Sequence, residues 1–529
     1  MTAPSTAPGS SAGDLRSLGR GTSLNLAGSV VAGVLNVLVP VFVTHGFRQE
    51  EAGTFFAATV LFTILINVGT IGADTGILRS IPRARALGQR AELRTQLRIA
   101  LLPPAVLSVL LAVVLVVLAP QIGRLAGSGK SSQPELFAQY LHVLGPLLPV
   151  AVVYVIGLSA SRGFGALKPL VLLEKVGRGL LQALLILLCV LVAPKTLLLI
   201  SAWVLPYLVA GAVLAVWLRR LLRQAEVRAS NAEQVPSRPL REIALEFWAF
   251  SAPRALSRVF SVALQRIDIL LVAGLLGPAE AAVYTAATRF LLLGLLFVQS
   301  IQQVMAPKFS ELIAHGDVHR STVLYRTTTS WLTLVAWPMY LMSAIFAPFL
   351  LQIFGPGYER GATVVTVLCL TMLVATTCGP VDSVLLMAGK SSWSLYNTGA
   401  ALLVNIGVDL VLVPRIGING AAIGWAAGIL VANLVPLYQV NRSLHMHPFG
   451  PATRQAMVVG GLCFGVLPLL VRLGLGAGLA GFLVAAVLST GAYAALLLRR
   501  REVFELAALT SALRRRPGRD RRGPAAPGT

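Results

Sequence analysis

Charged side chains are scarce in this sequence of 529 residues: only 12% are Asp, Glu, Lys or Arg, while 56% are hydrophobic. A soluble domain carries about 25% charged residues, so the composition excludes an ordinary water-soluble fold. Cysteine is scarce too. The four cysteines, Cys189, Cys369, Cys378 and Cys463, stand in apolar stretches and lack the spacing of a zinc or haem site. They resemble buried small hydrophobes, and we predict no disulfide, metal or cofactor.

Long hydrophobic runs take the place of charge. A transmembrane helix needs about 20 apolar residues, and in lipid such a run satisfies its own backbone hydrogen bonds as a helix. We therefore expect an all-α polytopic membrane protein. At about 20 residues for each span, the apolar runs predict about fourteen transmembrane helices. The expected spans are 23–45, 52–76, 97–119, 137–160, 168–193, 196–218, 243–276, 281–306, 322–353, 360–388, 392–413, 418–440, 453–474 and 477–498.

Basic residues gather at the ends of alternate spans. Most of the arginines outside the spans fall in the loops at 79–98 and 219–241 and in the segment after 498, and the formal net charge is +23. Cytoplasmic loops are the ones enriched in Lys and Arg. The distribution predicts that both termini lie in the cytoplasm, in a bacterial cytoplasmic membrane. Because the basic residues lie in the loops between the spans, the positive net charge reflects membrane orientation and does not indicate nucleic-acid binding.

An internal repeat divides the chain. Residues 51–59, Glu-Ala-Gly-Thr-Phe-Phe-Ala-Ala-Thr, correspond to residues 280–288, Glu-Ala-Ala-Val-Tyr-Thr-Ala-Ala-Thr, and the same offset places the first span on the seventh. Repeated halves of transporters commonly enclose a substrate site. The predicted units are a disordered tail at 1–22, six-helix lobes at 23–222 and 243–442 with a cytoplasmic linker at 223–242, two extra helices at 451–499, and a basic tail at 500–529.

Polar side chains form stripes along several spans. Ionisable groups inside a membrane are costly, so by default they face a cavity or a partner. At about 100° per residue, Arg254, Arg258, Gln265 and Asp268 share one face of the seventh span, and Arg266 stands beside that face. Guanidinium groups match the geometry of phosphate oxygens and stay charged when desolvated. The cluster of arginines on the seventh span therefore suggests an anionic ligand.

Similar stripes in other spans complete the set of candidates. We expect spans 1, 2, 5, 7, 8 and 11 to surround a hydrated cavity and the other spans to form the lipid-facing wall. The interiors of spans 3, 6, 13 and 14 are nearly free of polar side chains. The candidate substrate-binding residues are Arg254, Arg258, Arg266, Arg289, Lys175, Arg178, Asn67 and Gln265. The candidate ion-coupling residues are Asp268, Asp74 and Asp409.

Three structural alternatives stay open for these stripes. Each stripe could be a seam between helices that is held by hydrogen bonds. Arg254 lies near the expected cytoplasmic boundary, where an arginine can extend to the membrane surface. Glu174 and Arg178 stand one helical turn apart and could simply pair with each other.

Two short motifs stand out in the second half of the chain: Arg-Ile-Asp-Ile-Leu-Leu at 266–271 and Val-Pro-Arg-Ile-Gly-Ile-Asn-Gly-Ala-Ala-Ile-Gly at 413–424. They resemble motifs of the polysaccharide transporter family of the multidrug/oligosaccharidyl-lipid/polysaccharide exporter superfamily, and the likeness covers most of residues 20–442. The resemblance implies two lobes alternately open to each side. It also implies flipping of an undecaprenyl-pyrophosphate-linked oligosaccharide from the inner to the outer leaflet, with Arg254, Arg258, Arg266 and Asp268 lining the central cavity.

Other functions remain as alternatives. A lipid II flippase of the same superfamily would use a similar cavity, whereas a cation-coupled drug antiporter would not suit the arginines. A membrane glycosyltransferase or polymerase would be an enzyme and would need catalytic carboxylates outside, where the longest expected loop holds only Glu135. We expect a non-enzymatic transporter. Its expected partners are the lipid-linked oligosaccharide, membrane lipids and a polysaccharide polymerase, and the sequence leaves its oligomeric state open.

Overall fold

The computed structural model describes residues 11–87, 89, 92–126, 133–230, 238–314 and 317–500. Every regular element within these ranges is a helix. The predicted C-terminal tail after residue 500 and the first ten residues lie outside the described ranges. Helix α1 begins at Ser11, inside the stretch predicted to be a disordered tail, and α9 continues to Ser230, inside the predicted linker. Both helices therefore extend beyond the apolar runs that predicted them.

The helices follow one another with short connections, as the expected spans require. In chain order they are α1 (Ser11–Gly46), α2 (Gln49–Thr70), α3 (Ala73–Ala86), α4 (Leu93–Val117), α5 (Ala119–Ala126), α6 (Pro134–Leu144), η2 (Gly145–Leu147), α7 (Leu148–Gly163), η3 (Leu170–Arg178), α8 (Gly179–Val192), α9 (Thr196–Ser230), α10 (Leu240–Leu276), α11 (Pro278–Ala314), α12 (Val318–Ile345), α13 (Ala347–Leu351), η4 (Gln352–Phe354), η5 (Glu359–Gly361), α14 (Ala362–Thr377), α15 (Val381–Met387), α16 (Ser391–Ile416), α17 (Ile418–Leu444), α18 (Pro451–Gly460), η6 (Gly461–Val466), α19 (Leu467–Leu475) and α20 (Leu479–Arg499).

The number of membrane spans agrees closely with the prediction. Among the described residues, 12 helices are long and apolar enough to cross a membrane, and 13 if α12 and the segment after it, bent by 82°, form one span. The predicted span at 281–306 falls in α11, a helix of 37 residues. Several side chains of α11 lie outside the described residues, and this helix is not among the 12.

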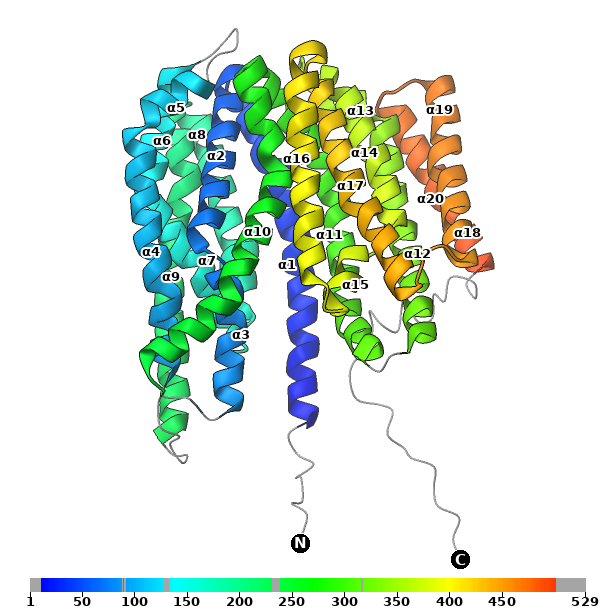
Figure 1. The fold of residues 1–529 in the computed structure, drawn as a ribbon. Coiled ribbons are helices and arrows are strands. Elements are labelled where there is room, and N and C mark those ends of the chain that lie inside the picture. The colour runs from blue at the N-terminus through cyan, green and yellow to red at the C-terminus, as the bar shows by residue number, and fades with distance from the viewer. Residues whose placement is uncertain are drawn as a thin grey trace, which may run out of the picture.

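The helices form two groups side by side (Figure 1). Helices α2 to α9 stand on one side, α11 to α20 stand on the other, and α1 lies between them. Helix α10 crosses from the first group to the second, and it packs on α2 and α3 as well as on α16 and α17. Pro253 stands inside α10 and removes a backbone hydrogen bond from it. This helix therefore links the two groups mechanically.

The two groups touch at the end where α1 ends and α2 begins. Gln49 donates a hydrogen bond from Nε2 to the carbonyl oxygen of Pro356 at 3.2 Å. Arg360 donates to Oε1 of Gln49 at 2.9 Å and forms an ion pair with Glu280 at 3.1 Å. A side chain at Gly53 would collide with the carbonyl of Pro278, so α2 and the start of α11 lie in direct backbone contact. This end of the molecule is closed by contacts between the groups.

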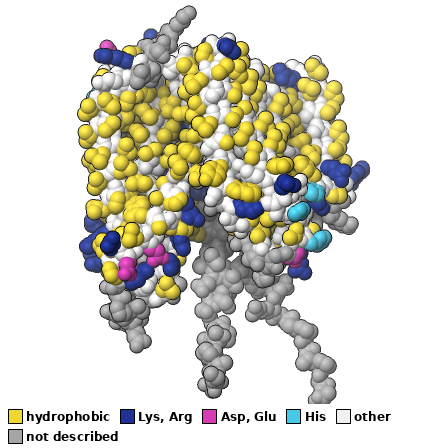
Figure 2. All heavy atoms as spheres, viewed as in Figure 1, with side chains coloured by type: hydrophobic (Ala, Val, Ile, Leu, Met, Phe, Trp, Pro, Cys, Tyr) yellow, Lys and Arg dark blue, Asp and Glu magenta, His cyan; other side chains and the backbone are white. Residues whose placement is uncertain are grey.

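The outer surface suits a lipid bilayer. Figure 2 shows hydrophobic side chains over the middle of the visible face, with Lys and Arg gathered toward its two ends. Many large aliphatic residues of α4 and α20 are exposed, among them Val113, Val117 and Val487. Exposed apolar side chains of this number are stable only in contact with lipid tails. The surface agrees with a protein that spans a membrane many times.

Small residues bring α16 and α17 together. A Cβ atom at Gly420 would meet the backbone of Leu412, and one at Gly428 would lie 3.0 Å from the carbonyl oxygen of Ala401. A Cβ atom at Gly424 would likewise collide with the carboxylate of Asp409. Small residues at this four-residue spacing allow two helices to approach closely, as α16 and α17 do.

Candidate substrate cavity

A cavity of about 530 Å³ lies among α1, α2, α7, η3, α9, α10 and α11. Seven of the side chains predicted from the sequence line it: Asn67, Asp74, Lys175, Arg178, Arg258, Arg266 and Arg289. They come from helices that are far apart in the chain. The structure therefore brings most of the predicted substrate-binding residues to one place.

A π-helix presents the basic residues of the fifth span. Residues Leu170–Arg178 form η3, which then continues as α8. A π-helix is wider than an α-helix and is found frequently at functional sites. Its wider turn changes which residues share a face, so the regular spacing of 100° per residue does not apply here. Even so, Glu174, Lys175 and Arg178 all line the cavity.

Arg178 is the arginine in the cavity that has a carboxylate partner. Its Nε donates to Oε2 of Glu174 at 2.8 Å, and its Nη1 donates to Gln182 at 3.2 Å. The guanidinium also stacks over the ring of Tyr207, with 4.5 Å between its carbon and the ring centroid. The pairing of Glu174 with Arg178 within one turn, which the sequence left open, is therefore present. It neutralises this part of the cavity wall.

The three arginines that α10 and α11 contribute to the cavity have no such partner. Among the described residues, no carboxylate lies within ion-pair distance of Arg258, Arg266 or Arg289, and the buried Nε of Arg289 has no hydrogen-bond partner. The cavity is lined by six cationic side chains and two carboxylates, Asp74 and Glu174. Arg258 is exposed, whereas Arg266 and Arg289 are half-buried, and a desolvated charge without a partner costs several kcal/mol. The cavity is therefore electrostatically prepared for an anion.

Two predictions about the spans were wrong. Span 6 was expected to form lipid-facing wall, yet Trp203 and Tyr207 of α9 line the cavity and pack against Phe62. Arg162, at the end of α7 in span 4, also lines it and was missed. The sequence placed Arg162 at a membrane boundary, where a basic residue needs no special explanation. The aromatic residues of α9 could not be distinguished from ordinary packing residues by type.

Two predicted substrate-binding residues lie elsewhere. Gln265 is exposed and is not part of the cavity lining. Arg254 is exposed as well: its Nη1 donates to the carbonyl oxygen of Phe250 at 3.3 Å, and its guanidinium stacks over the Phe250 ring at 3.7 Å. Arg254 thus follows the alternative of an arginine at the membrane boundary. Helical phase predicted which face of α10 is polar. It did not predict which positions along that face line the cavity.

Asp268 and Asp409 also lie away from the cavity. They are 2% and 0% exposed, and they stand in a dry cluster between α10, α11, α16 and α17. Tyr284 donates its hydroxyl to Oδ2 of Asp268 at 2.9 Å. Both oxygens of Asp409 and both polar atoms of the Asn405 side chain lack hydrogen-bond partners among the described residues. We refer to Asp268, Tyr284, Asn405 and Asp409 as the carboxylate cluster. Span 11 contributes to this cluster rather than to the cavity.

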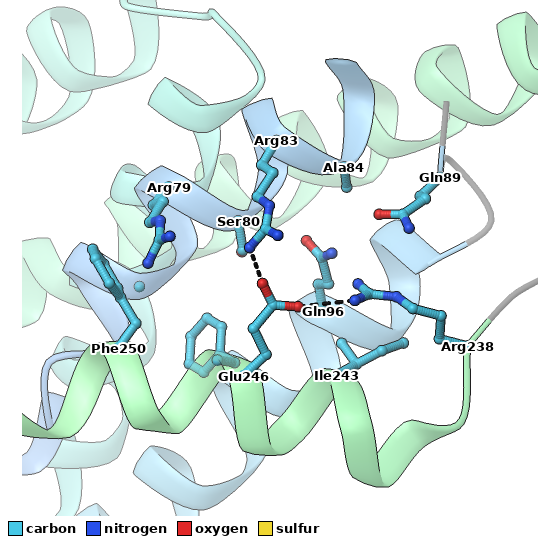
Figure 3. A pocket seen from close by; sticks show the side chains of 12 residues that line it. Arg79, Ser80, Arg83, Ala84, Gln89, Gln96, Arg238, Ile243, Glu246 and Phe250 are labelled. Atoms are coloured by element: carbon cyan, nitrogen blue, oxygen red, sulfur yellow. Dashed lines mark hydrogen bonds and ion pairs between the residues drawn. The ribbon is translucent and has the colours of Figure 1, made fainter. Parts of the chain in front are cut away.

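A network of ion pairs fastens the first turns of α10 to the first group of helices (Figure 3). Glu246 of α10 pairs with Arg83 of α3 and with Arg238, whose Nη1 lies 2.9 Å from Oε2. Arg238 also binds Glu92, which is only 1% exposed, with 3.0 Å between Nη2 and Oε2. Burial favours the protonated form of Glu92, but the hydrogen bonds and charge of Arg238 outweigh burial and hold its pKa below the ordinary value of 4.5.

A family model described as "Polysaccharide biosynthesis protein" matches residues 18–313, more than half of the chain. The chain belongs to this family. A second family model, MatE, matches residues 253–411. No curated protein matches the sequence. The motif resemblance that the sequence showed is therefore confirmed.

Solved structures share the fold of this family member. The lipid II flippase MurJ in an inward closed conformation superimposes with a TM-score of 0.67 at 13% identity, covering 92% of this chain and 99% of MurJ. An inward-facing multidrug resistance MATE family transporter of the MOP superfamily gives 0.64 at 18% identity, covering 79% and 98%.

A MOP superfamily transporter from Pyrococcus furiosus, whose binding pocket is described as having reversed polarity, gives a TM-score of 0.54 at 18% identity, covering 84% of this chain and 99% of that one. These identities are low, so the likenesses establish the fold alone. The chain is thus a multi-pass membrane protein of the polysaccharide biosynthesis protein family, and it shares its fold with these transporters.

Proposed function

We propose that this transporter flips an undecaprenyl-pyrophosphate-linked oligosaccharide, a precursor of a cell-surface polysaccharide, from the inner to the outer leaflet. The observation that carries the proposal is the group of unpaired arginines, Arg258, Arg266 and Arg289, in a cavity with an excess of positive charge. Guanidinium groups bind phosphate oxygens in a planar, two-pronged geometry. A pyrophosphate would supply the negative charge that the cavity lacks.

The remaining cavity wall suits the sugars of such a substrate. The amides of Asn67 and Gln182 and the ring of Trp203 stand along it. Amide groups can hydrogen-bond sugar hydroxyls, and aromatic rings offer flat apolar faces. The prenyl chain would remain in the surrounding lipid, so that moving it between the leaflets would require no transfer of apolar surface into water.

Alternating access supplies the movement in this proposal. In this proposal both termini lie in the cytoplasm and the membrane is a bacterial cytoplasmic membrane, as the basic loops predict. The end that Gln49, Arg360 and Glu280 hold closed then faces outward, so the structure represents a state that is closed to the outside. Transport would break these contacts while the lobes at 23–222 and 243–442 rock against each other. Helix α10 and its ion-pair network would carry motion between the lobes.

The test is export in cells that carry Arg258→Ala together with Arg266→Ala. We expect the variant to insert normally and export to fall at least about a hundredfold, because two charge-assisted hydrogen bonds of about 1.5–3 kcal/mol each are lost. Lipid-linked glycan should accumulate on the cytoplasmic leaflet. The matched control is Arg254→Ala with Gln265→Ala, on the same helix but outside the cavity. Normal export by the Arg258 and Arg266 variant would refute the proposal.

Two alternatives differ in the substrate that accumulates. A lipid II flippase would trap peptidoglycan precursor on the inner leaflet, and depletion of the protein would stop growth. A drug antiporter would export cations, which the excess of positive charge in the cavity would repel. Analysis of the lipids trapped after depletion separates these functions from export of a surface polysaccharide.

We further propose that the carboxylate cluster couples transport to a cation, either a proton or Na⁺. Asp268 and Asp409 are buried together, and no basic side chain among the described residues pairs with either of them. Two buried carboxylates without positive charge nearby are too costly to remain ionised unless a cation joins them. Asn405 adds an unpartnered amide oxygen at the same place. Asp74, the third coupling candidate, lines the substrate cavity instead, and its Oδ1 is buried without a partner.

Replacement of Asp409 by Asn tests the coupling proposal separately from the substrate proposal. We expect Asp409→Asn to bind the lipid-linked substrate like the wild type, because Asp409 lies outside the cavity. Transport driven by a pH or Na⁺ gradient should fall at least about tenfold. The matched control is Asp382→Asn, which removes another buried carboxylate of the second group, hydrogen-bonded to Ser394. Equal responses of both variants to the gradients would argue against a specific cation site.

A further inference from the structure

A second, larger hollow lies on the outer face of the first group of helices. It has a volume of about 940 Å³ and runs between α4 and α9, with α7 beneath it. Helices α4 and α9 each pack on α7. Small residues form its floor and sides, among them Ala105, Gly157, Gly211 and Ala215. We call this hollow the α4–α9 groove. It is separate from the substrate cavity, because it lies on the lipid-facing side of α7.

The lining of the groove is almost wholly apolar. Leu101, Leu102, Val150, Val153 and Leu218 contribute to its walls. Leu102 is 67% exposed, so the groove is open to the surroundings along this side. In a bilayer those surroundings are lipid chains. An apolar groove of this shape can accept an acyl chain, but shape alone does not select one lipid, because all lipid tails are similarly apolar.

Charge at one end of the groove provides the selection. The ionisable residues in its lining are Arg94, Arg98 and Arg219, and the lining holds no Asp or Glu. Arg94 and Arg98 belong to the first two turns of α4, and Arg219 belongs to the later part of α9. Figure 1 shows the start of α4 and the end of α9 at the same end of the molecule. The cations therefore meet where the headgroup of a lipid in the groove would lie.

We propose that the α4–α9 groove binds a phospholipid with an anionic headgroup, with an acyl chain along the groove and its phosphate between Arg98 and Arg219. Basic residues at a membrane surface attract anionic lipids by about 1 kcal/mol per residue. Two arginines that converge on one groove turn this general attraction into a defined site. The lipid would fill the space between α4 and α9 and hold both helices on α7. The proposal does not depend on the identity of the transported substrate.

The experiment is native mass spectrometry of the full-length protein, purified in detergent and titrated with phosphatidylglycerol or phosphatidylcholine. We expect one phosphatidylglycerol to be retained, at least about tenfold more tightly than phosphatidylcholine. Arg98→Gln with Arg219→Gln should weaken phosphatidylglycerol about 30-fold, as loss of two charges at about 1 kcal/mol each requires. The matched control is Arg442→Gln with Arg454→Gln, two exposed arginines outside the groove, which should leave binding unchanged.

A second variant tests the groove itself. A Cβ at Gly211 would lie 3.6 Å from Val150, so Gly211→Leu can be accommodated while its side chain fills the groove. It should reduce retention of phosphatidylglycerol without altering any charge. Equal affinity for both lipids, or unchanged binding in the double arginine variant, would overturn the proposal. So would a dimer that Gly211→Leu dissociates, because a second copy of the chain would then occupy the groove.

Discussion

The substrate cavity and the carboxylate cluster handle buried charge in opposite ways. The cavity collects unpaired arginines from α10 and α11 beside α1, α2 and α7, where water or a ligand can reach them. The cluster keeps Asp268 and Asp409 buried among α10, α11, α16 and α17, and no basic side chain among the described residues pairs with either of them. Positive and negative side chains of the same helix, α10, therefore belong to two different sites. Arg266 and Asp268 stand only two residues apart, yet Arg266 lines the cavity and Asp268 belongs to the carboxylate cluster.

This separation explains why a total charge count is a poor guide to the ligand. Within the expected spans, basic and acidic side chains are nearly balanced. Three of the acidic ones, Asp268, Asp382 and Asp409, lie outside the cavity lining, which leaves the cavity strongly positive. An unpaired charge raises the free energy of its own site and cannot be offset by an opposite charge in another compartment. The ligand is therefore selected by local charge.

The largest expected effect comes from reversing the charge of the cavity. Arg266→Glu with Arg289→Glu should weaken binding of a pyrophosphate-linked lipid by more than about a hundredfold, because two charge-assisted contacts become repulsive. Binding of purified lipid-linked substrate to the detergent-solubilised protein measures this. Lysine at both positions keeps the charge but loses the planar geometry, and should cost only about tenfold. Wild-type affinity in the glutamate variant would mean that the arginines are structural.

The next effect concerns the helix contact beside the carboxylate cluster. Gly424→Val places side-chain atoms against the carboxylate of Asp409 and should destabilise the folded protein by about 3 kcal/mol. Thermal unfolding in detergent measures the change. Gly407, on α16, has nothing within 4 Å of a Cβ, so Gly407→Ala is the matched control and should leave the melting temperature unchanged or slightly higher. Similar melting temperatures for both variants would contradict the close seam.

A smaller effect is expected from the hydroxyl that supports Asp268. Tyr284→Phe removes the donor to Oδ2 and leaves a buried carboxylate less solvated, at a cost of about 2 kcal/mol. The cost should appear in thermal unfolding, together with an altered response of transport to pH or Na⁺. Tyr340→Phe is the control, because the buried hydroxyl of Tyr340 has no partner among the described residues. Equal stability of the two variants would show that the Tyr284 bond contributes little.

The smallest effect concerns the network that joins α10 to the first group. Because its pKa is lowered in the folded protein, Glu92 stabilises the fold above pH 4.5, and this contribution is lost as the pH falls through the folded pKa. Glu92→Gln should destabilise the protein by about 1 kcal/mol at neutral pH and flatten the loss of stability below pH 4.5. Unfolding measured between pH 3 and 7, with Glu135→Gln at an exposed site outside this network as the control, tests this. An unchanged pH profile would exclude Glu92 as a contributor.

Motifs and periodicity predicted different parts of the site to different extents. The arginines of α10 were found because ionisable residues are rare in apolar spans and therefore conspicuous. Arg162 and Trp203 were missed, since a boundary arginine and a packed aromatic residue occur in every membrane protein. Arg254 shares the polar face of α10 but lies outside the cavity lining, because helical phase gives the direction of a side chain around its helix and not its depth along the cavity.

The sequence by itself determined that this protein is a bundle of membrane-spanning helices with polar stripes, because lipid forces long apolar runs to become helices and makes every buried charge costly. Its motifs also indicated the family. Only the tertiary structure decided that Arg266 faces the cavity while Asp268 faces Tyr284 and α16, and that span 5 begins as a π-helix. Which partner a side chain meets depends on how helices distant in the chain pack, and spacing along one helix does not encode it.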